Sequence, residues 1–217
     1  ASELAEIPCA DLAVMLVLNP NSVNPFEPVR DEMLTRAKVP MTKEEVRWVS
    51  VARLGVQPGD TVWDVGAGTG AVTFELARKA MDGAVFAVER NTEAIELIAQ
   101  NRQKLGGFNV HIVQGHAPEV LAYLPKPNCV FVGGSGGNMR EIIETALKKN
   151  PETRIAVNAI ALETLQETQR LFAEFGLQQV EITQLSAARG KSIGCYTMMT
   201  ANNPVFILSG KGDKYGE

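Results

Sequence analysis

Short β-branched apolar runs alternate with longer helical segments from about residue 60 onward, and this alternation limits the possible folds more than any other feature. Strands are expected at 60–65, 84–89, 110–113, 129–132 and 154–158, and helices at 69–81, 92–105, 117–124, 138–149 and 162–175. Helices that connect consecutive strands in this way form right-handed crossovers, which place the strands parallel in one sheet. The sequence therefore predicts an α/β fold.

Both ends of this alternating region depart from the pattern. Residues 177–185 and 204–208 have strand character, and the Gly- and Ser-containing stretch between them has little helical periodicity. Two strands without a crossover helix are expected to form an antiparallel pair at one side of the sheet. Before the core, residues 42–53 are expected to form a helix with a capping box, in which Thr42 is the N-cap and Glu45 follows three residues later.

Composition and charge exclude several classes of protein. Apolar residues make up 45% of the 217 residues, enough for one globular domain with a small extension. The 21 basic and 25 acidic residues give a net charge of −4, which argues against a nucleic-acid binder but allows a local basic pocket. The longest strongly apolar run, 12–18, is far shorter than the ~20 residues of a membrane-spanning helix. No membrane association is expected.

Cysteine and histidine residues give no sign of a disulfide framework or a metal site. The cysteines at 9, 129 and 195 are far apart and include no CxxC pair, and His111 and His116 do not form a metal cluster on their own. We therefore expect no metal ion, and the reducing cytoplasm is the simplest location for the chain.

The strongest motif is the turn from the first strand to the first helix, Asp64-Val-Gly-Ala-Gly-Thr-Gly70. Its glycines tolerate positive φ and let a ligand approach the backbone, and the helix that follows offers free N–H groups to an anion. Glu89 ends the second strand, where a carboxylate can bind the two hydroxyls of a ribose. Glycines needed only for a tight bend are the simpler alternative, but the complete strand–loop–helix–strand pattern favours nucleoside binding.

Two cofactors fit this pattern. Gly66-x-Gly68-x-x-Ala71 matches a loose dinucleotide fingerprint, so an NAD-binding oxidoreductase or a nucleotide-sensing module stays open. The compact Asp-x-Gly-x-Gly-x-Gly form and the antiparallel pair at the end of the chain, which the dinucleotide-binding sheet lacks, favour S-adenosylmethionine.

Asp64 to Gly70 together with Glu89 resembles the class I methyltransferases, and further segments narrow the resemblance. These segments are Lys38-Val-Pro-Met-Thr-Lys-Glu-Glu-Val-Arg47, Gly115-His-Ala-Pro-Glu119, Phe131-Val-Gly-Gly-Ser-Gly-Gly137, Asn158-Ala-Ile-Ala-Leu-Glu163, Ala188-Arg-Gly-Lys191 and Asn203-Pro-Val-Phe206. Together they resemble the C-terminal domain of the decarboxylating precorrin-6Y methyltransferases of cobalamin synthesis, which also occurs alone as a (cobalt-)precorrin carbon-15 methyltransferase. The resemblance covers roughly residues 37–211.

The resemblance implies a Rossmann-like fold with a seven-stranded, mostly parallel sheet, a terminal antiparallel strand and helices on both faces. It also implies methylation of carbon 15 of a precorrin by S-adenosylmethionine, with loss of carbon dioxide from the ring C acetate. Another small molecule or RNA as the methyl acceptor is the alternative. No catalytic residue is assigned, because an activated sulfonium and an electron-rich ring carbon need no protein nucleophile.

Cofactor contacts follow from the resemblance. Residues 66–70 would hold the methionine part, Glu89 the ribose, and His116 with Ala117 the adenine edge. His116 stands where the family has an acidic residue, so the backbone groups of 116 and 117 are the safer assignment. The full set is Thr42, Asp64, Gly66, Ala67, Gly68, Thr69, Gly70, Glu89, His116, Ala117 and Gly133.

Substrate contacts are expected from donors, because the macrocycle carries many carboxylates on an otherwise acidic protein. The candidates are Ser135, Arg140, Asn158, Arg189 and Lys191. Arg189 is favoured because Gly190 and Gly194 lie near it, although any one of these cations alone is more simply a solvated surface charge. Tyr196, Met198 and Met199 are expected to pack in the core rather than to line a cleft.

The sequence and the resemblance also predict how the chain is divided into domains. Residues 1–36, with the strand-like run 12–18 and several prolines, are expected to be the tail or linker of an upstream methylase domain. Residues 37–211 are expected to form the methyltransferase domain, and residues 212–217 a flexible C-terminus. The resemblance also suggests a homotetramer.

Overall fold

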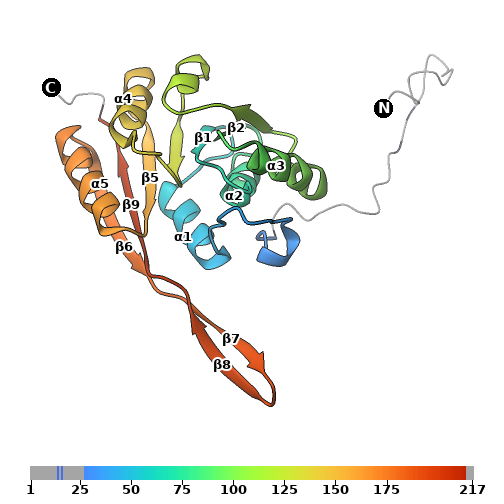
Figure 1. The fold of residues 1–217 in the computed structure, drawn as a ribbon. Helices are drawn as coiled ribbons and strands as arrows, with labels where there is room; N and C mark the ends of the chain where they lie inside the picture. The colour runs from blue at the N-terminus through green and yellow to red at the C-terminus, as the bar shows by residue number, and fades with distance from the viewer. Residues whose placement is uncertain (1–13, 15, 17–26, 214–217) are drawn as a thin grey trace.

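The structure is a computed structural model that describes residues 14, 16 and 27–213 (Figure 1). Apart from residues 14 and 16, the strand-like run at 12–18 lies outside the described residues, as do residues 214–217. Among the described residues, no helix is both long and apolar enough to cross a bilayer.

The described chain contains short 3-10 helices, α-helices and strands in an order close to the expected one. They are η2 (Asp31–Met33), α1 (Glu44–Leu54), β1 (Thr61–Val65), α2 (Ala71–Lys79), β2 (Ala84–Glu89), α3 (Thr92–Leu105), β3 (Val110–Gln114), η3 (Glu119–Tyr123), β4 (Cys129–Val132), α4 (Met139–Lys149), β5 (Arg154–Ala159), α5 (Leu162–Glu174), β6 (Gln178–Leu185), β7 (Ala188–Ile193), β8 (Tyr196–Ala201) and β9 (Val205–Lys211).

Seven of the strands form one sheet in the order β3-β2-β1-β4-β5-β9-β6. The first five pair in parallel, whereas β9 lies between β5 and β6 and runs antiparallel to both. This arrangement confirms the expected α/β class and the seven-stranded sheet. It also confirms the antiparallel pair expected from the strands at 177–185 and 204–208, which are β6 and β9.

Alternate residues of the central strands pack against helices on opposite faces of the sheet. Val62 of β1 joins a core with α1, α2 and α3, whereas Trp63 and Val65 join a second core with α4, α5 and η3. This two-residue period is the expected consequence of the strand geometry. Because Asp64 shares its face with Val62, its carboxyl group is directed toward the α1–α3 side.

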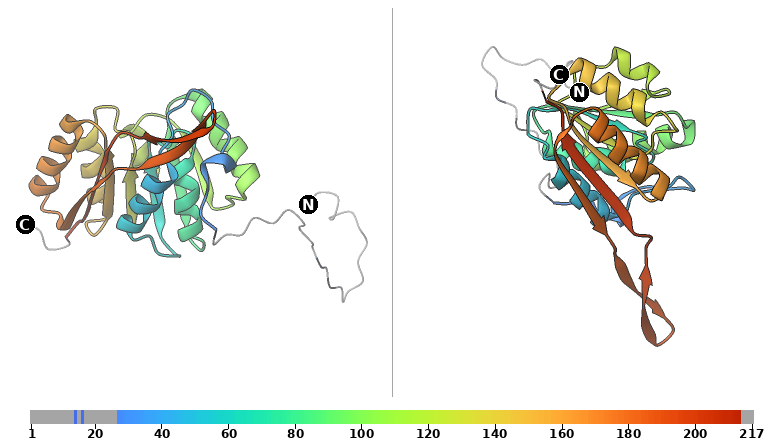
Figure 2. Two further views of the ribbon diagram at one scale, coloured as in Figure 1. Left: turned by 90° about the horizontal axis from the view of Figure 1, so that it is seen from below. Right: turned by 90° about the vertical axis from the view of Figure 1, so that its left-hand side faces the viewer.

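β7 and β8 form a separate two-stranded hairpin that extends away from the body (Figures 1 and 2). Nearly all of its residues are exposed, including Tyr196, Met198 and Met199, so the expectation that these three pack in the core is wrong. The hairpin itself was not expected, because its strands bury no apolar face and so lack the usual alternation. Its main local signal in the sequence is Gly194, which adopts a φ of 63° in the turn between the two strands.

Three local expectations also differ from the structure. α2 begins at Ala71 rather than at residue 69, and the expected helix at 117–124 is a 3-10 helix. The N-cap of α1 is Lys43 and makes no side-chain capping bond, so the capping box of Thr42 and Glu45 is wrong. Glu45 instead turns its carboxylate toward Arg189.

Residues 27–36 pack on the globular body. Val29 and Leu34 are buried in the α1–α3 core, and the Val29 N–H donates to the Glu75 carboxylate at 2.7 Å. The side chain of Asn101 on α3 holds Thr35 by bonds to both its N–H and its carbonyl. This part of the expected linker is therefore integral to the fold.

Candidate cofactor and active site

A cavity of about 580 Å³ opens at the carboxyl ends of the parallel strands, where ligands bind in open α/β sheets. Its walls come from the loop after β1, the end of β2, the loops after β3 and β4, and the end of β5. Two further segments contribute: the strap, defined as residues 36–43 before α1, and the root of the β7–β8 hairpin at Asn202 and Asn203.

The loop after β1 packs backbone against backbone with the loop after β4. Gly66 has φ of 75°, and a Cβ on it would lie 2.6 Å from the carbonyl oxygen of Gly134. Its N–H and that of Ala67 both donate to the Val88 carbonyl, at 3.0 and 3.1 Å. A side chain at 66 would therefore force the two loops apart, which explains the glycine physically.

The first turn of α2 faces the same cavity. Ala71 and Val72 line it, directly after Gly70 in the left-handed conformation. The N–H groups of a first helical turn have no partner within the helix and carry a partial positive charge. The carboxylate of an amino acid moiety fits such a site.

Asp64 is a buried carboxyl group in the wall of this cavity. Thr73 donates its hydroxyl to Oδ2 at 2.5 Å, whereas Oδ1 has no hydrogen-bond partner among the described residues. Burial raises the pKa of Asp64 to about 7, against the opposing effect of the Thr73 bond. A buried oxygen without a partner, next to a cavity, is suited to accept from the ammonium group of a ligand.

Glu89 is held in position by the backbone. Its Oε2 accepts from the Gly68 N–H at 2.9 Å, and its Oε1 accepts from the N–H groups of Arg90 and Asn91 at 2.8 and 2.9 Å. A carboxylate has about four acceptor positions, so these three bonds orient it and leave capacity for a ribose hydroxyl.

His116 has both ring nitrogens engaged. Arg90 Nη1 lies 3.2 Å from Nε2, and a guanidinium only donates, so Nε2 accepts and Nδ1 carries the hydrogen toward Glu119 Oε2 at 3.2 Å. The carbonyl oxygens of His116 and Ala117 are also bonded, to the Val120 N–H and Asn138 Nδ2. For an adenine edge, the described contacts leave open the backbone N–H groups of 116 and 117 and a second lone pair on each of the two carbonyl oxygens.

The strap covers the glycine loop. The Pro40 carbonyl oxygen would lie 3.2 Å from a Cβ on Gly68, so the two backbones are in close contact. Thr42, expected as a cofactor contact, lines the cavity, and its carbonyl accepts from Arg47 Nη1 at 2.6 Å.

Three other expected positions lie together on the side of the cavity between β4 and β5. Gly133, Ser135 and Asn158 all line it. Ser50 Oγ donates its single hydrogen to the Val46 carbonyl at 2.7 Å and lies 2.9 Å from one polar atom of the Asn158 amide, whereas the other amide atom has no partner among the described residues. Asn158 thus offers one amide atom for a hydrogen bond beside the loop after β4.

The structure does not bring the expected substrate cations into the cavity wall. Arg140 forms a two-bond ion pair with Glu174 of α5, at 2.6 and 2.5 Å. Arg189 pairs with carboxylates of α1 and η2, and Lys191 lies farther along the hairpin. Among the described residues, the cations in the wall are Lys43, which belongs to the segment 38–47 of the resemblance, and Arg90, which no motif contains.

The strand order separates the two cofactor types left open by the sequence. An antiparallel strand such as β9, which lies between β5 and β6, is absent from the dinucleotide-binding order, in which all strands run parallel. The glycine loop, Asp64 Oδ1 and Glu89 together match the carboxylate, ammonium and ribose groups of S-adenosylmethionine.

Comparisons with known proteins agree with this geometry. Residues 35–211 match the model of the precorrin methyltransferase domain family. A protein of Pyrobaculum calidifontis named probable cobalt-precorrin-6B C(15)-methyltransferase (decarboxylating) is 42% identical over 184 residues, 83% of this chain and 94% of its own. The Salmonella typhimurium protein named cobalt-precorrin-6B C(15)-methyltransferase (decarboxylating) is 34% identical over 183 residues, again 83% of this chain and 94% of its own.

Solved structures give the same result. The precorrin-6y C5,15-methyltransferase of Geobacter metallireducens has a TM-score of 0.79 and 35% identity, and the match covers 84% of this chain and 97% of that chain. A SAM-dependent O-methyltransferase of Thermotoga maritima, 21% identical with a TM-score of 0.67, shares the fold. The chain belongs to the precorrin methyltransferase family.

Proposed function

We propose that this chain methylates carbon 15 of a precorrin or cobalt-precorrin and removes the ring C acetate carboxyl group as carbon dioxide, in cobalamin biosynthesis. The observation that carries the proposal is the match to relatives named for this activity over 94% of their length. The cofactor cradle described above lies within the matched region.

S-adenosylmethionine supplies a methyl group on a positively charged sulfur. The protein holds this cofactor through the loop at 66–70, the Asp64 carboxyl group and the Glu89 carboxylate. Positioning of two reactants can lower a barrier by up to roughly 7–11 kcal/mol, so no protein nucleophile is required. The loop after β4, at Gly133 and Ser135, would set the approach of the acceptor carbon.

The acceptor is a tetrapyrrole with several carboxylates, and the cavity offers it both polar and apolar surface. Lys43 and Arg90 can bind carboxylates at the wall, and the unpartnered atom of the Asn158 amide can form a hydrogen bond between β4 and β5. Val46 and Ile160 line the same cavity, and a carboxylate held against such apolar side chains is poorly solvated, which favours loss of carbon dioxide.

The direct test uses the purified chain, methyl-labelled S-adenosylmethionine, and the metal-free and cobalt-containing precorrins. We expect a product that has gained one labelled methyl group and lost one carbon dioxide, detected by mass spectrometry. Label transfer to RNA or to another small molecule, without transfer to either precorrin, would contradict the proposal.

We also propose that the chain self-associates through the β7–β8 hairpin, as a homotetramer. An isolated two-stranded hairpin is marginally stable in water, and this one exposes Ile193, Tyr196, Met198 and Met199 at 52–73%. Light scattering should give a mass about four times 23.5 kDa for the native chain and a smaller mass for Tyr196→Lys/Met199→Lys. A monomeric native chain would contradict this part of the proposal.

A further inference from the structure

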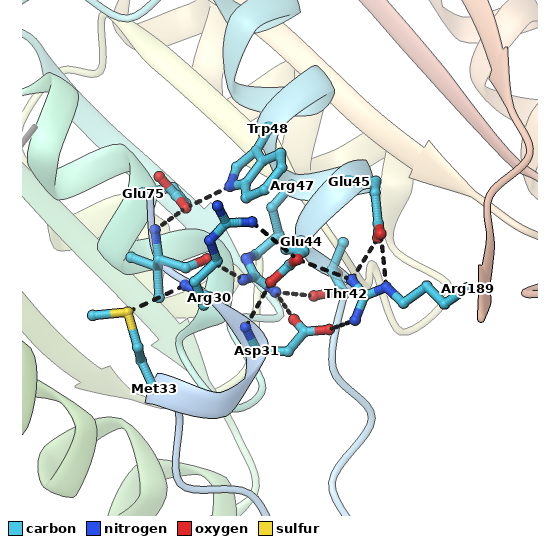
Figure 3. A network of polar contacts seen from close by, with 11 residues as sticks. Arg30, Asp31, Met33, Thr42, Glu44, Glu45, Arg47, Trp48, Glu75 and Arg189 are labelled. Carbon is cyan, nitrogen blue, oxygen red and sulfur yellow. Dashed lines mark hydrogen bonds and ion pairs between the residues drawn. The ribbon is translucent and has the colours of Figure 1, made fainter. Parts of the chain in front are cut away.

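Arg189 connects the hairpin to the acidic groups of η2 and α1 (Figure 3). Its Nε and Nη2 donate to the two oxygens of Glu45 at 2.7 Å each, and its Nη1 donates to Asp31 Oδ2 at 3.0 Å. Glu44 Oε1 lies 3.4 Å from Nη2. All three of its nitrogen atoms therefore contact carboxylates of the same chain, and the guanidinium is committed to an internal contact.

Asp31 connects Arg189 to the strap through the side chain of Arg47. Asp31 Oδ1 accepts from Arg47 Nη1 at 2.6 Å, and the same nitrogen donates to the Thr42 carbonyl at 2.6 Å (Figure 3). Arg47 is fully buried, and its Nη2 also donates to the Val29 carbonyl. A chain of short polar contacts thus leads from the hairpin to the strap residue that lines the cavity.

The strap depends on contacts of this kind because residues 36–43 belong to no helix or strand. Asn101 holds the chain just before it at Thr35, and Arg47 holds it at Thr42. On the other side of Arg189, the hairpin root contributes Asn202 and Asn203 to the cavity wall. Arg189 therefore joins two wall segments that are far apart in the sequence.

We propose that Arg189 is a positioning residue for S-adenosylmethionine: it ties the hairpin root to the strap and so fixes two walls of the cofactor cavity. This inference rests on the proposed function of the cavity and reverses the expectation that Arg189 binds substrate. The same guanidinium holds the pKa of Glu45 below its usual range, so both partners are charged at neutral pH.

The test measures S-adenosylhomocysteine affinity by calorimetry for the full chain and its variants. Arg189→Ala should weaken binding about three- to tenfold, as expected for a partly exposed ion-pair network, and should raise the KM for the cofactor with little change in kcat. Lys191→Ala is the matched control, because it removes a positive charge from the same strand. Lys191 makes no ion pair among the described residues, so this variant should leave the S-adenosylhomocysteine affinity unchanged.

Glu45→Gln separates this role from general stability. It should weaken cofactor binding in the same direction, and the double variant Arg189→Ala/Glu45→Gln should be no weaker than Arg189→Ala, because both act through one contact. Arg189→Lys should restore part of the affinity. Wild-type affinity should fall with added salt more than that of Arg189→Ala.

Several outcomes would overturn the inference. These are an unchanged S-adenosylhomocysteine affinity in Arg189→Ala, a loss confined to the KM for the tetrapyrrole, or additive losses in the double variant. Failure of the proposed function is distinguishable, since it would show as absent methyl transfer or absent S-adenosylhomocysteine binding in the wild-type chain.

Discussion

Replacement of Asp64 by Asn tests the electrostatics of the cavity directly. In the folded chain burial raises the pKa of this carboxyl group from 3.8 to about 7. Between pH 3.8 and about 7, Asp64 is ionised in the unfolded chain but still protonated in the folded chain. The free energy of unfolding therefore falls as the pH rises through this range. The full effect above pH 7 is about 4 kcal/mol, since each unit of pKa difference corresponds to about 1.4 kcal/mol.

Asn has nearly the shape of a protonated Asp and can still accept from Thr73, but it does not titrate. Wild type and Asp64→Asn should therefore have similar free energies of unfolding at low pH. The stability advantage of the variant should grow by about 2 kcal/mol between pH 5 and pH 7, and it should level off above pH 8 at about 4 kcal/mol.

Urea unfolding at intervals from pH 5 to pH 9 measures this difference, with the fluorescence of buried Trp63, adjacent to Asp64, as the probe. Asp82→Asn is the matched control, since it removes one carboxylate from an exposed position. A difference between wild type and Asp64→Asn that stays constant with pH, or that favours wild type more as the pH rises, would refute the reasoning. Asp64→Asn should also bind S-adenosylhomocysteine more weakly, because the carboxylate that faces its ammonium group is lost.

Three further substitutions test the cavity walls. Gly66→Ala should lower the free energy of unfolding by about 2 kcal/mol in urea unfolding, because residue 66 has a left-handed backbone and its Cβ would collide with Gly134. An unchanged free energy of unfolding would mean that the two loops separate at no cost. Glu89→Gln should weaken S-adenosylhomocysteine binding about tenfold in calorimetry with an unchanged circular dichroism spectrum, and unaltered affinity would place the ribose elsewhere. Lys43→Ala should raise the KM for the tetrapyrrole severalfold at constant cofactor affinity, whereas equal losses of both would indicate a structural role.

Local patterns predicted most of the fold. The central parallel strands β1, β4 and β5 bury side chains on both faces, so their apolar runs are conspicuous in the sequence. The loop at 64–70 was equally clear, because its glycines and Asp64 follow a strand directly. The β7–β8 hairpin was not predicted, because its residues are exposed on both faces and its sequence therefore lacks the alternation of apolar and polar residues.

A long-range ion pair explains why the expected capping box of Thr42 and Glu45 is wrong. Glu45 was interpreted as a helix-capping residue from its spacing to Thr42, but its partner is Arg189, 144 positions away. Sequence spacing contains no information about a pair so distant. The same pair accounts for Arg189, whose neighbouring glycines suggested a ligand site although the guanidinium already had carboxylate partners in its own chain.

The absence of any side chain between Gly66 and Gly134 has a consequence for how this enzyme can diversify. At this point the loops after β1 and β4, which line two sides of the cavity, meet through peptide groups, with no side-chain atoms to absorb a shift. A substitution that moves the loop after β4 must either leave this contact unchanged or move the loop after β1 with it. Changes in the shape of the cavity are therefore best tolerated at the hairpin root, where the wall is formed by Asn202 and Asn203.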